Sequence, residues 1–174
     1  SAGNPNSFFI HNFFVYILTM LRNKYLTFIL FFIITFSASL IGGVATVSFK
    51  EPWYSTLIKS SFNPPDWVFG PVWTILYLMM TIAIWLYWHS INRNHKIVFY
   101  YFIHIAVNTT WSIVFFVFHQ ILLAMIVLIF LIGLIIFLMI CFKRVNMTSF
   151  YLMTPYLLWC CYALILNTSI YLLN

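Results

Sequence analysis

Long stretches of this chain carry no charged side chain. A run of 25 uncharged residues separates Lys24 from Lys50, and a run of 26 separates Asp66 from Arg93. Each run matches one membrane-spanning helix, because about 20 apolar residues cross the ~30 Å hydrocarbon core of a bilayer. Only 6% of the 174 residues are charged and 64% are hydrophobic, whereas soluble domains carry about 25% charged residues. A soluble monomer is therefore excluded, and most of the outer surface must face lipid.

Two further uncharged runs complete the count of helices. The 46 residues between Lys96 and Lys143 would form a helix of roughly 69 Å, more than twice the hydrocarbon thickness. They must therefore fold back as two helices, and the polar pair His119-Gln120 near the middle marks the turn. The 30 residues after Arg144 are enough for one more helix.

These runs predict an all-α membrane protein, a bundle of five transmembrane helices in one domain over residues 25–174. The helices are expected at about 25–49, 67–91, 97–118, 121–142 and 149–172, with a long polar loop at about 50–66. The lipid bilayer is then the main partner of the chain.

Basic side chains mark one side of the predicted bundle. With five spans, the N-terminal segment, the second loop and the fourth loop share a side, which holds six bases and no acid. By the positive-inside rule the N-terminus is cytoplasmic and the C-terminus lies on the opposite side. Because the bases are scattered in pairs, nucleic-acid binding is not favoured. The six bases are Arg22, Lys24, Arg93, Lys96, Lys143 and Arg144.

Residues 1–24 precede the first predicted helix and have a different pattern. They begin with a small polar stretch, Ser1 to Ser7, which is typical of a tag remnant or a flexible leader. The apolar run from Phe8 to Leu21 is too short to span a bilayer comfortably. We expect either a leader or a segment that lies in the membrane interface, and Met20 is an alternative start.

The sequence offers no metal site and no conventional catalytic site. Cys141, Cys160 and Cys161 form no CxxC pair. His104 and His119 lie about 22 Å apart along a helix axis, so they cannot ligate one metal together. No nucleophile, base and orienting group can be placed together. We therefore expect no metal and no obligatory cofactor.

The predicted loop at 50–66 is stiff where it enters the second helix. Pro64 and Pro65 impose an extended backbone there. Asp66 follows them and is expected to cap the helix that begins at Trp67, by accepting its free backbone N–H groups. A contact between Asp66 and a ligand is the alternative.

Polar and aromatic side chains fall on single faces of three predicted helices. Trp73 and Tyr77 lie four residues apart in the second helix, and Trp159 and Ala163 have the same spacing in the fifth. An amide in hydrocarbon needs a partner, so Asn108 in the third helix either forms an interhelical hydrogen bond or faces a polar cavity. The face of the third helix that contains this amide carries His104, Asn108, Trp111, Ser112 and Phe115.

Four ordered motifs run through the loop and three of the helices. They are WYSTL at 53–57, FNPPDWVFGPVWTILY at 62–77, NTTWSIVFF at 108–116 and PYLLW at 155–159, followed by Ala163 and Leu166-Asn167. This pattern closely resembles the translocator protein family, the TspO/MBR group of tryptophan-rich sensory proteins and peripheral benzodiazepine receptors. The resemblance covers about residue 25 to the end of the chain, and a match with this spacing across three helices is highly specific.

The resemblance implies a five-helix bundle whose first loop caps a pocket between the helices. Relatives bind tetrapyrroles such as protoporphyrin IX and haem, and other flat apolar molecules such as benzodiazepine-type drugs. Aromatic rings would stack on such a ligand, and small polar groups would meet its edges. The ligand-binding residues that the resemblance implies here are Trp53, Tyr54, Pro64, Trp73, Tyr77, Asn108, Trp111, Ser112, Trp159, Ala163 and Asn167.

The residues leave four functions open. A membrane receptor or sensor for tetrapyrroles is expected first. Some bacterial relatives are reported to degrade protoporphyrin IX photo-oxidatively, and the resemblance would give Trp73 and Trp159 that role here. Ligand transport is the third function, although spans without Asp or Glu do not favour proton coupling, and an inert structural subunit is the fourth.

Location and assembly are further expectations. The composition and the resemblance predict a multi-pass protein of a bacterial inner membrane or an equivalent membrane. A homodimer is a hypothesis, for which the third helix offers small residues but no GxxxG motif.

Overall fold

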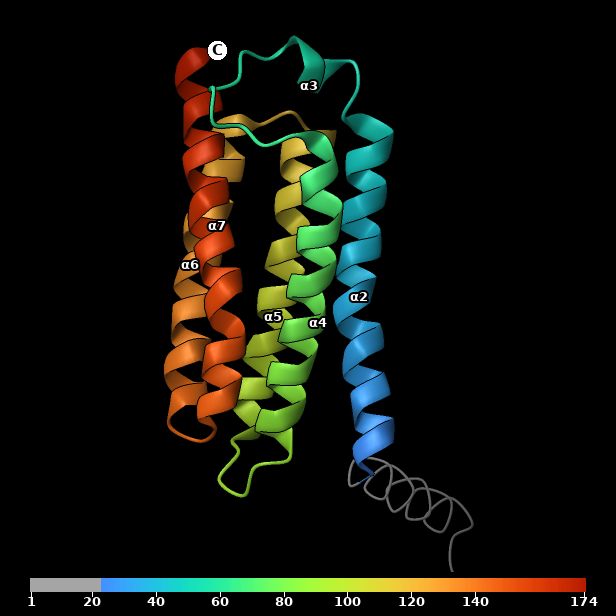
Figure 1. Cartoon of the computed structure of the whole chain (residues 1–174), viewed down its shortest axis with the longest axis vertical. Helices are drawn as coiled ribbons and strands as arrows, with labels where there is room; N and C mark the ends of the chain where they lie inside the picture. The colour runs from blue at the N-terminus through green and yellow to red at the C-terminus, as the bar shows by residue number, and fades with distance from the viewer. Residues whose placement is uncertain (1–22) are drawn as a thin grey trace, which may run out of the picture.

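The computed structural model describes residues 23–174, and five helices in this part of the chain are long and apolar enough to span a membrane. The prediction of an all-α bundle with five transmembrane helices is confirmed (Figure 1). The hypotheses for residues 1–24 lie outside the described residues, apart from Asn23 and Lys24. The elements in chain order are α2 (Lys24–Phe49), α3 (Trp53–Thr56), the 3-10 turn η1 (Asp66–Val68), α4 (Phe69–Trp88), α5 (His95–Ser112), the π-helix η2 (Ile113–Val117), α6 (Ile121–Lys143) and α7 (Met147–Leu173).

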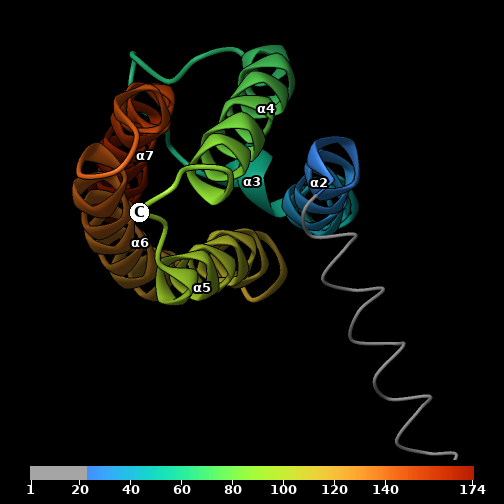
Figure 2. The ribbon, with the colours of Figure 1, turned by 90° about the horizontal axis from the view of Figure 1, so that it is seen from below.

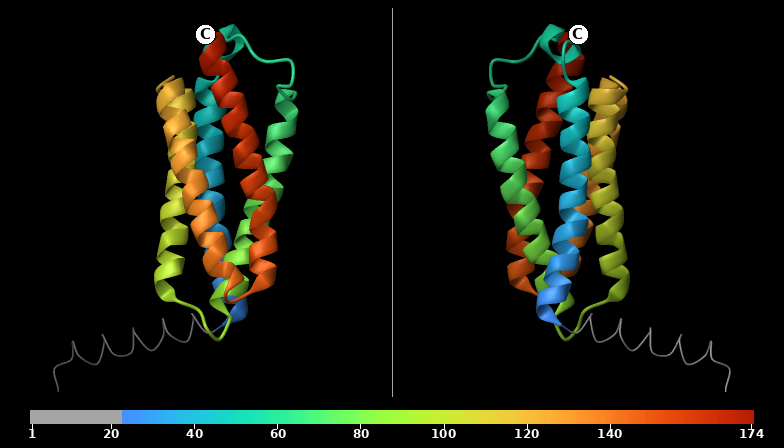
Figure 3. Two further views of the ribbon diagram at one scale, coloured as in Figure 1. Left: turned by 90° about the vertical axis from the view of Figure 1, so that its left-hand side faces the viewer. Right: turned by 90° about the vertical axis from the view of Figure 1, so that its right-hand side faces the viewer.

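The five long helices form one closed ring. Viewed along the bundle (Figure 2), their order around the ring is α2, α4, α7, α6 and α5, and each helix packs against the next. α3 and the segment after it cross the end of the bundle at which α2 ends and α4 begins (Figures 1 and 3). The segment 50–66 therefore covers one end of the ring.

The outward faces of the helices are apolar. α6 is the clearest case, because its inward side chains, such as Leu131 and Ile135, are fully buried while large apolar side chains cover its outer face. Exposure of these groups would be unfavourable in water but is favourable in hydrocarbon. The chain is thus an integral, multi-pass membrane protein. The exposed apolar side chains of α6 include Leu122, Leu123, Ile126, Ile129, Phe130, Ile136, Phe137 and Ile140.

Asparagine side chains set the start of three helices. The Oδ1 atoms of Asn23, Asn94 and Asn146 accept backbone N–H groups at the starts of α2, α5 and α7, at distances between 2.9 and 3.2 Å. Such caps satisfy donors that a helix start leaves free. Because of these caps, the three helices begin one or two residues before the expected positions 25, 97 and 149.

Two helices end differently from the expectation. The second helix was expected to reach residue 91, but α4 ends at Trp88. The third was expected to be α-helical to residue 118, but α5 ends at Ser112 and a π-helix follows, in which the Phe118 amide donates to the Ile113 carbonyl at 3.1 Å. The apolar run continues unchanged through this segment, so its periodicity could not predict the wider turn.

A buried hydrogen-bond network joins three helices. Tyr77 Oη on α4 donates to Asn108 Oδ1 on α5 at 2.5 Å, and Asn108 Nδ2 donates to Tyr156 Oη on α7 at 2.9 Å. His104 Nε2 lies 3.1 Å from the same Tyr156 hydroxyl. All four side chains are buried. The Asn108 amide therefore forms the interhelical hydrogen bonds that were one of its two expected roles.

Charged side chains gather at the two ends of the ring. The bases at the end where α2 begins are Lys24, Arg93, Lys96, Lys143 and Arg144 (Figure 1). The charged residues at the covered end are Lys50, Glu51, Lys59 and Asp66, which include both acids of the chain. This segregation is the one expected from the sequence, and the cytoplasmic location of the uncovered end remains a prediction.

We predict that the uncovered end faces the cytoplasm, because its bases resist translocation. The chain would be produced in bacteria with either green fluorescent protein or alkaline phosphatase fused after Asn174. We expect an active phosphatase fusion and a dark fluorescent fusion. A bright fluorescent fusion with an inactive phosphatase would contradict the predicted orientation.

We predict that Tyr156→Phe destabilises the bundle. The substitution removes the hydroxyl that pairs with Asn108 and His104, and it leaves their polar atoms buried with fewer partners. The expected loss is roughly 1–2 kcal/mol, measured as a fall in the Tm of the detergent-solubilised protein. Tyr151→Phe is the matched control, because Tyr151 lies on the same helix and is 61% exposed. An equal Tm for both variants would show that the network does not stabilise the fold.

Candidate ligand pocket beneath the 50–66 segment

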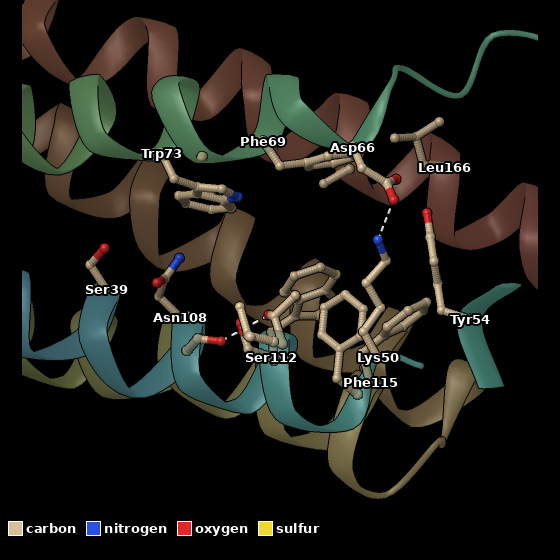
Figure 4. Close-up of a pocket in the computed structure, with 18 of the residues that line it drawn as sticks. Ser39, Lys50, Tyr54, Asp66, Phe69, Trp73, Asn108, Ser112, Phe115 and Leu166 are labelled. Atoms are coloured by element: carbon tan, nitrogen blue, oxygen red, sulfur yellow. Dashed lines mark hydrogen bonds and ion pairs between the residues drawn. The ribbon is translucent and has the colours of Figure 1, made fainter. Parts of the chain in front are cut away.

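A cavity of about 450 Å³ lies inside the ring, next to the covering segment 50–66. Its walls come from α2, α4, α5, η2 and α7, as the labelled side chains in Figure 4 illustrate. The volume falls within the range of small-molecule sites, roughly 300–1,000 Å³. The residues expected at a ligand site that line this cavity are Tyr54, Trp73, Tyr77, Asn108, Trp111, Ser112, Trp159, Ala163 and Asn167.

Aromatic rings form the wall between α4 and α7. Trp73 and Tyr77 lie one helical turn apart on α4, and their ring centroids are 5.5 Å apart with an angle of 31° between planes. Trp159 on α7 meets the edge of Phe69 at 5.9 Å. All four residues line the cavity. A flat ligand would find faces and edges of aromatic rings there, which are the geometries that aromatic pairs prefer.

Small residues form the wall contributed by α2. Ser39, Gly42, Gly43 and Thr46 follow the i, i+3, i+4, i+7 pattern of one helical face, and all line the cavity. A Cβ atom on Gly42 would lie only 3.1 Å from Ser112 Oγ, so a larger residue there would require the Ser112 side chain to move by a few tenths of an ångström. Sequence reasoning missed this wall, although a cluster of small residues in an otherwise apolar helix was the available signal.

The covering segment is tied to α7. Its backbone and side chains bond to residues that are 100 to 116 positions away in the chain. The bonds join Tyr162 Oη to the Phe62 carbonyl (2.7 Å), Ser169 Oγ to Ser60 Oγ (3.3 Å), and Asn174 Oδ1 and Nδ2 to the backbone N–H and C=O of Ile58 (2.9 and 3.1 Å). The segment therefore stays in place over the α7 side of the cavity.

Tyr54 is the part of α3 that enters the cavity. It is 7% exposed, and burial is the main effect that raises the pKa of its hydroxyl, so the group stays neutral. The ammonium groups of Lys50 and Lys59 lie 5.1 and 4.5 Å from the centre of its ring. These cation–π contacts place two positive charges near the mouth of the cavity.

A single ion pair links α2 to the start of α4 across the cavity mouth. Lys50 Nζ bonds to Asp66 Oδ2 (Figure 4), and Glu51 Oε1 lies 3.8 Å from the same ammonium. The expected capping role of Asp66 is wrong, because no side-chain hydrogen bond caps η1 or α4 and the carboxylate faces Lys50 instead. The Asp66 side chain is 61% exposed, and such a pair contributes little stability. This side of the mouth is therefore less firmly closed than the α7 side.

Two residues that the resemblance implied do not line the cavity. Trp53 precedes Tyr54 by one residue in a helical turn, so it points in a different direction. Its ring stacks on His119 at 4.2 Å and contacts the edge of Phe115 at 5.3 Å. Pro64 also lies outside the lining, whereas its neighbour Asn63 belongs to it.

The π-helix supplies a further part of the lining. Phe115 and Phe116 are both buried, and both border the cavity. A π-helix advances less per residue around its axis than an α-helix does, and such turns are frequent at functional sites. Phe115 was grouped with the inward face of the third helix from its spacing, but Phe116 was not.

The cavity lining is suited to an apolar organic ligand. Within residues 23–174 no three His, Cys, Asp or Glu side chains are grouped as metal ligands would be. His104 bonds to Tyr156 and does not line the cavity. The polar groups of the lining are amides, hydroxyls, indole N–H groups and the Lys50–Asp66 pair.

Comparison with known proteins identifies the family. Residues 26–173 match the TspO/MBR family. The tryptophan-rich protein TspO of Chlorobaculum tepidum is 37% identical over 126 residues, which cover 70% of this chain and 79% of that protein. TspO of Archaeoglobus fulgidus is 32% identical over 76% of this chain and 87% of its own length. The translocator protein of Homo sapiens is 31% identical over 68% of this chain and 73% of its own length. This membrane protein therefore belongs to the TspO/MBR family.

Proposed function

We propose that this protein is a membrane receptor or sensor that binds tetrapyrroles, or similarly flat apolar ligands, in the cavity under the 50–66 segment. The observation that carries the proposal is the aromatic wall of Trp73, Tyr77, Trp159 and Phe69 along one cavity. Indole and phenol rings on one wall favour a planar ligand over a branched one of the same size. The names of relatives, which include a tryptophan-rich sensory protein, agree with this proposal.

The charge at the cavity mouth supports a ligand with acidic groups. Lys50 and Lys59 both lie near Tyr54, and only Lys50 has acidic partners among the described residues. Carboxylates on the edge of a tetrapyrrole would meet these ammonium groups while the macrocycle lies between the aromatic rings. Asp66 would then exchange its bond to Lys50 for water, at little cost because it is exposed.

The exposed part of the lining supports an apolar ligand that comes from the bilayer. Gly43 and Val47 on α2, and Gly70 and Thr74 on α4, line the cavity and are also exposed at the surface. A Cβ atom on Gly43 or Gly70 would meet nothing within 4 Å. A flat molecule dissolved in lipid would therefore reach the aromatic wall between these two helices with few side chains in its path.

We expect the double variant Trp73→Phe plus Trp159→Phe to bind protoporphyrin IX about tenfold more weakly than the unaltered protein. Each substitution removes part of a stacking surface, which contributes roughly 0.5–1.5 kcal/mol for each aromatic pair. The Kd would be measured by titrating the purified protein with the porphyrin and following the quenching of tryptophan emission.

A matched control keeps the number of tryptophans equal. Trp67→Phe plus Trp85→Phe removes two tryptophans that do not line the cavity, and its Kd should stay unchanged. Absence of saturable quenching in the unaltered protein, or an equal Kd for both double variants, would overturn the proposed function.

Light-driven breakdown of a bound porphyrin is the second candidate function. It is favoured by the position of Trp73 and Trp159 on the same cavity, where both indoles would lie close to a bound macrocycle. The chemistry would need light and dissolved oxygen, since no hydrolytic constellation borders the cavity in residues 23–174.

We expect illuminated, air-saturated protein to lose the absorbance of bound protoporphyrin IX at least several times faster than the Trp73→Phe plus Trp159→Phe variant. Both samples would be loaded to the same fraction of bound porphyrin, so that weaker binding does not affect the comparison. Equal rates of loss would rule out a catalytic role for the two tryptophans and would leave the receptor function standing.

A further inference from the structure

Positive charge at the uncovered end of the bundle has no negative partner in the chain. The chain has only two acids, Glu51 and Asp66, and both lie at the covered end. Within residues 23–174, both ion pairs are formed by Lys50, at that same end. Helices of 20 or more residues separate the acids from the bases of the uncovered end. The counter-charge of these bases must therefore come from outside the chain.

Two of these bases lie on outward faces of α5 and α6 that adjoin. The two helices are neighbours in the ring (Figure 2), and on their outer side Tyr100 and Phe137 meet edge to face, with 5.3 Å between ring centroids. Lys96 precedes Tyr100 by four residues on α5, so the two share a helical face. Arg144 follows Phe137 by seven residues and keeps helical dihedral angles as the C-cap of α6, so these two also share a face. Both bases are exposed.

Lys96 and Arg144 lie at similar depths along the bundle. α5 begins and α6 ends at the uncovered end (Figure 1). With a rise of about 1.5 Å per residue, Lys96 lies about 6 Å and Arg144 about 10 Å from the level of the Tyr100–Phe137 contact, toward that end. A difference of about 4 Å is within the reach of two long basic side chains. One phosphate group can therefore contact both.

Apolar side chains lie between these bases and the middle of the membrane. Phe99 and Tyr100 on α5, and Phe137 and Ile140 on α6, are 39–63% exposed. These four side chains form what we call the α5–α6 boundary. Exposed aromatic and aliphatic groups at this depth are suited to contact with fatty-acyl chains. The surface thus joins two positive charges near the membrane edge to an apolar strip inside the membrane, which matches the charge and hydrocarbon of an acidic phospholipid.

Two other bases of the same end are directed elsewhere. The guanidinium of Arg93 lies 5.1 Å from the ring centre of Trp88 on α4. The ammonium of Lys143 lies 5.6 Å from the ring centre of Phe150 on α7. These cation–π contacts hold the two charges against α4 and α7. They therefore provide a natural comparison for the pair at the α5–α6 boundary.

We propose that Lys96 and Arg144 bind the phosphate of an anionic phospholipid whose acyl chains lie along the α5–α6 boundary. A phosphatidylcholine is disfavoured, because its choline places a like charge near the two bases. A second copy of the chain packed here in the same orientation would bring no acid to them, since both acids lie at the covered end. No residue of this site lines the cavity, so the inference does not depend on the proposed function.

The test measures which lipid the protein retains. The full chain would be released for native mass spectrometry from micelles that contain equal amounts of phosphatidylglycerol and phosphatidylcholine with identical acyl chains. We expect bound phosphatidylglycerol to exceed phosphatidylcholine by roughly 25-fold, because each base near a membrane surface contributes about fivefold.

A pair of double variants identifies the bases responsible. Lys96→Gln plus Arg144→Gln should reduce the preference to about onefold, and each single substitution should reduce it about fivefold. Arg93→Gln plus Lys143→Gln is the matched control, since it removes the same charge from the same end of the bundle, and it should keep the preference. An equal loss in both double variants would show a diffuse attraction by net charge and would overturn the site.

Thermal stability gives a second readout. All four substituted side chains are exposed, so both double variants should have the Tm of the unaltered protein in detergent without lipid. Added phosphatidylglycerol should raise the Tm of the unaltered protein and of the control variant, but not of Lys96→Gln plus Arg144→Gln. An equal rise in both double variants would contradict the proposal.

Two further outcomes would identify a different occupant. Glycerol 3-phosphate carries the same anionic group without acyl chains, and at the concentration of the lipid it should not displace bound phosphatidylglycerol. Displacement would show a site for free phosphate compounds and would overturn the lipid site. A mass of two chains without bound lipid would assign the α5–α6 boundary to a second copy and would also overturn it.

Discussion

The hydrocarbon core of a bilayer offers no hydrogen-bond partner, and this constraint organises the whole structure. The five helices satisfy their own backbones, and polar side chains inside the ring pair across helices. Asn108 joins α4, α5 and α7 through Tyr77 and Tyr156. Thr35 Oγ1 and Tyr101 Oη, 2.7 Å apart, join α2 to α5 in the same way. A few buried polar contacts thus join the helices of the ring, and the surrounding lipid cannot replace them.

Because of the same constraint, the hydrogen bonds of the cavity lining show which polar groups hold the helices together. Asn108, which joins three helices, has hydrogen-bond partners at both ends of its amide, whereas Asn167 Oδ1 and Trp111 Nε1 are buried with none within residues 23–174. Aromatic rings of α4 and α7 form one wall of the cavity, and small residues of α2 form another. Several hydrogen bonds join the covering segment to the α7 side of the bundle. On the side between α2 and α4 the mouth carries the Lys50–Asp66 ion pair, whose carboxylate is exposed. The walls of the cavity and its mouth therefore differ in chemistry.

Periodicity predicted much of this site, because residues four apart on a helix share a face whatever the helix packs against. Trp73 and Tyr77, and likewise Trp159 and Ala163, follow this rule and line one cavity. Spacing alone did not separate Trp53 from its neighbour Tyr54, and of these two residues of α3 only Tyr54 lines the cavity. Phe116 lies four residues after Ser112 and borders the cavity from the π-helix.

The sequence by itself determined the number of spans and the segregation of charge, because burying a charge in hydrocarbon costs more than any local preference can offset. It also determined the family, because the motifs and their spacing can be recognised without knowledge of the fold. Only the tertiary structure decided that α2 contributes a wall of small residues and that Asp66 pairs with Lys50. It alone distinguished the Asn108 amide, which is hydrogen-bonded at both ends, from the Asn167 amide, whose Oδ1 has no hydrogen-bond partner within residues 23–174. These features depend on which helices become neighbours, and the order α2, α4, α7, α6, α5 is set by packing between distant segments rather than by any local pattern.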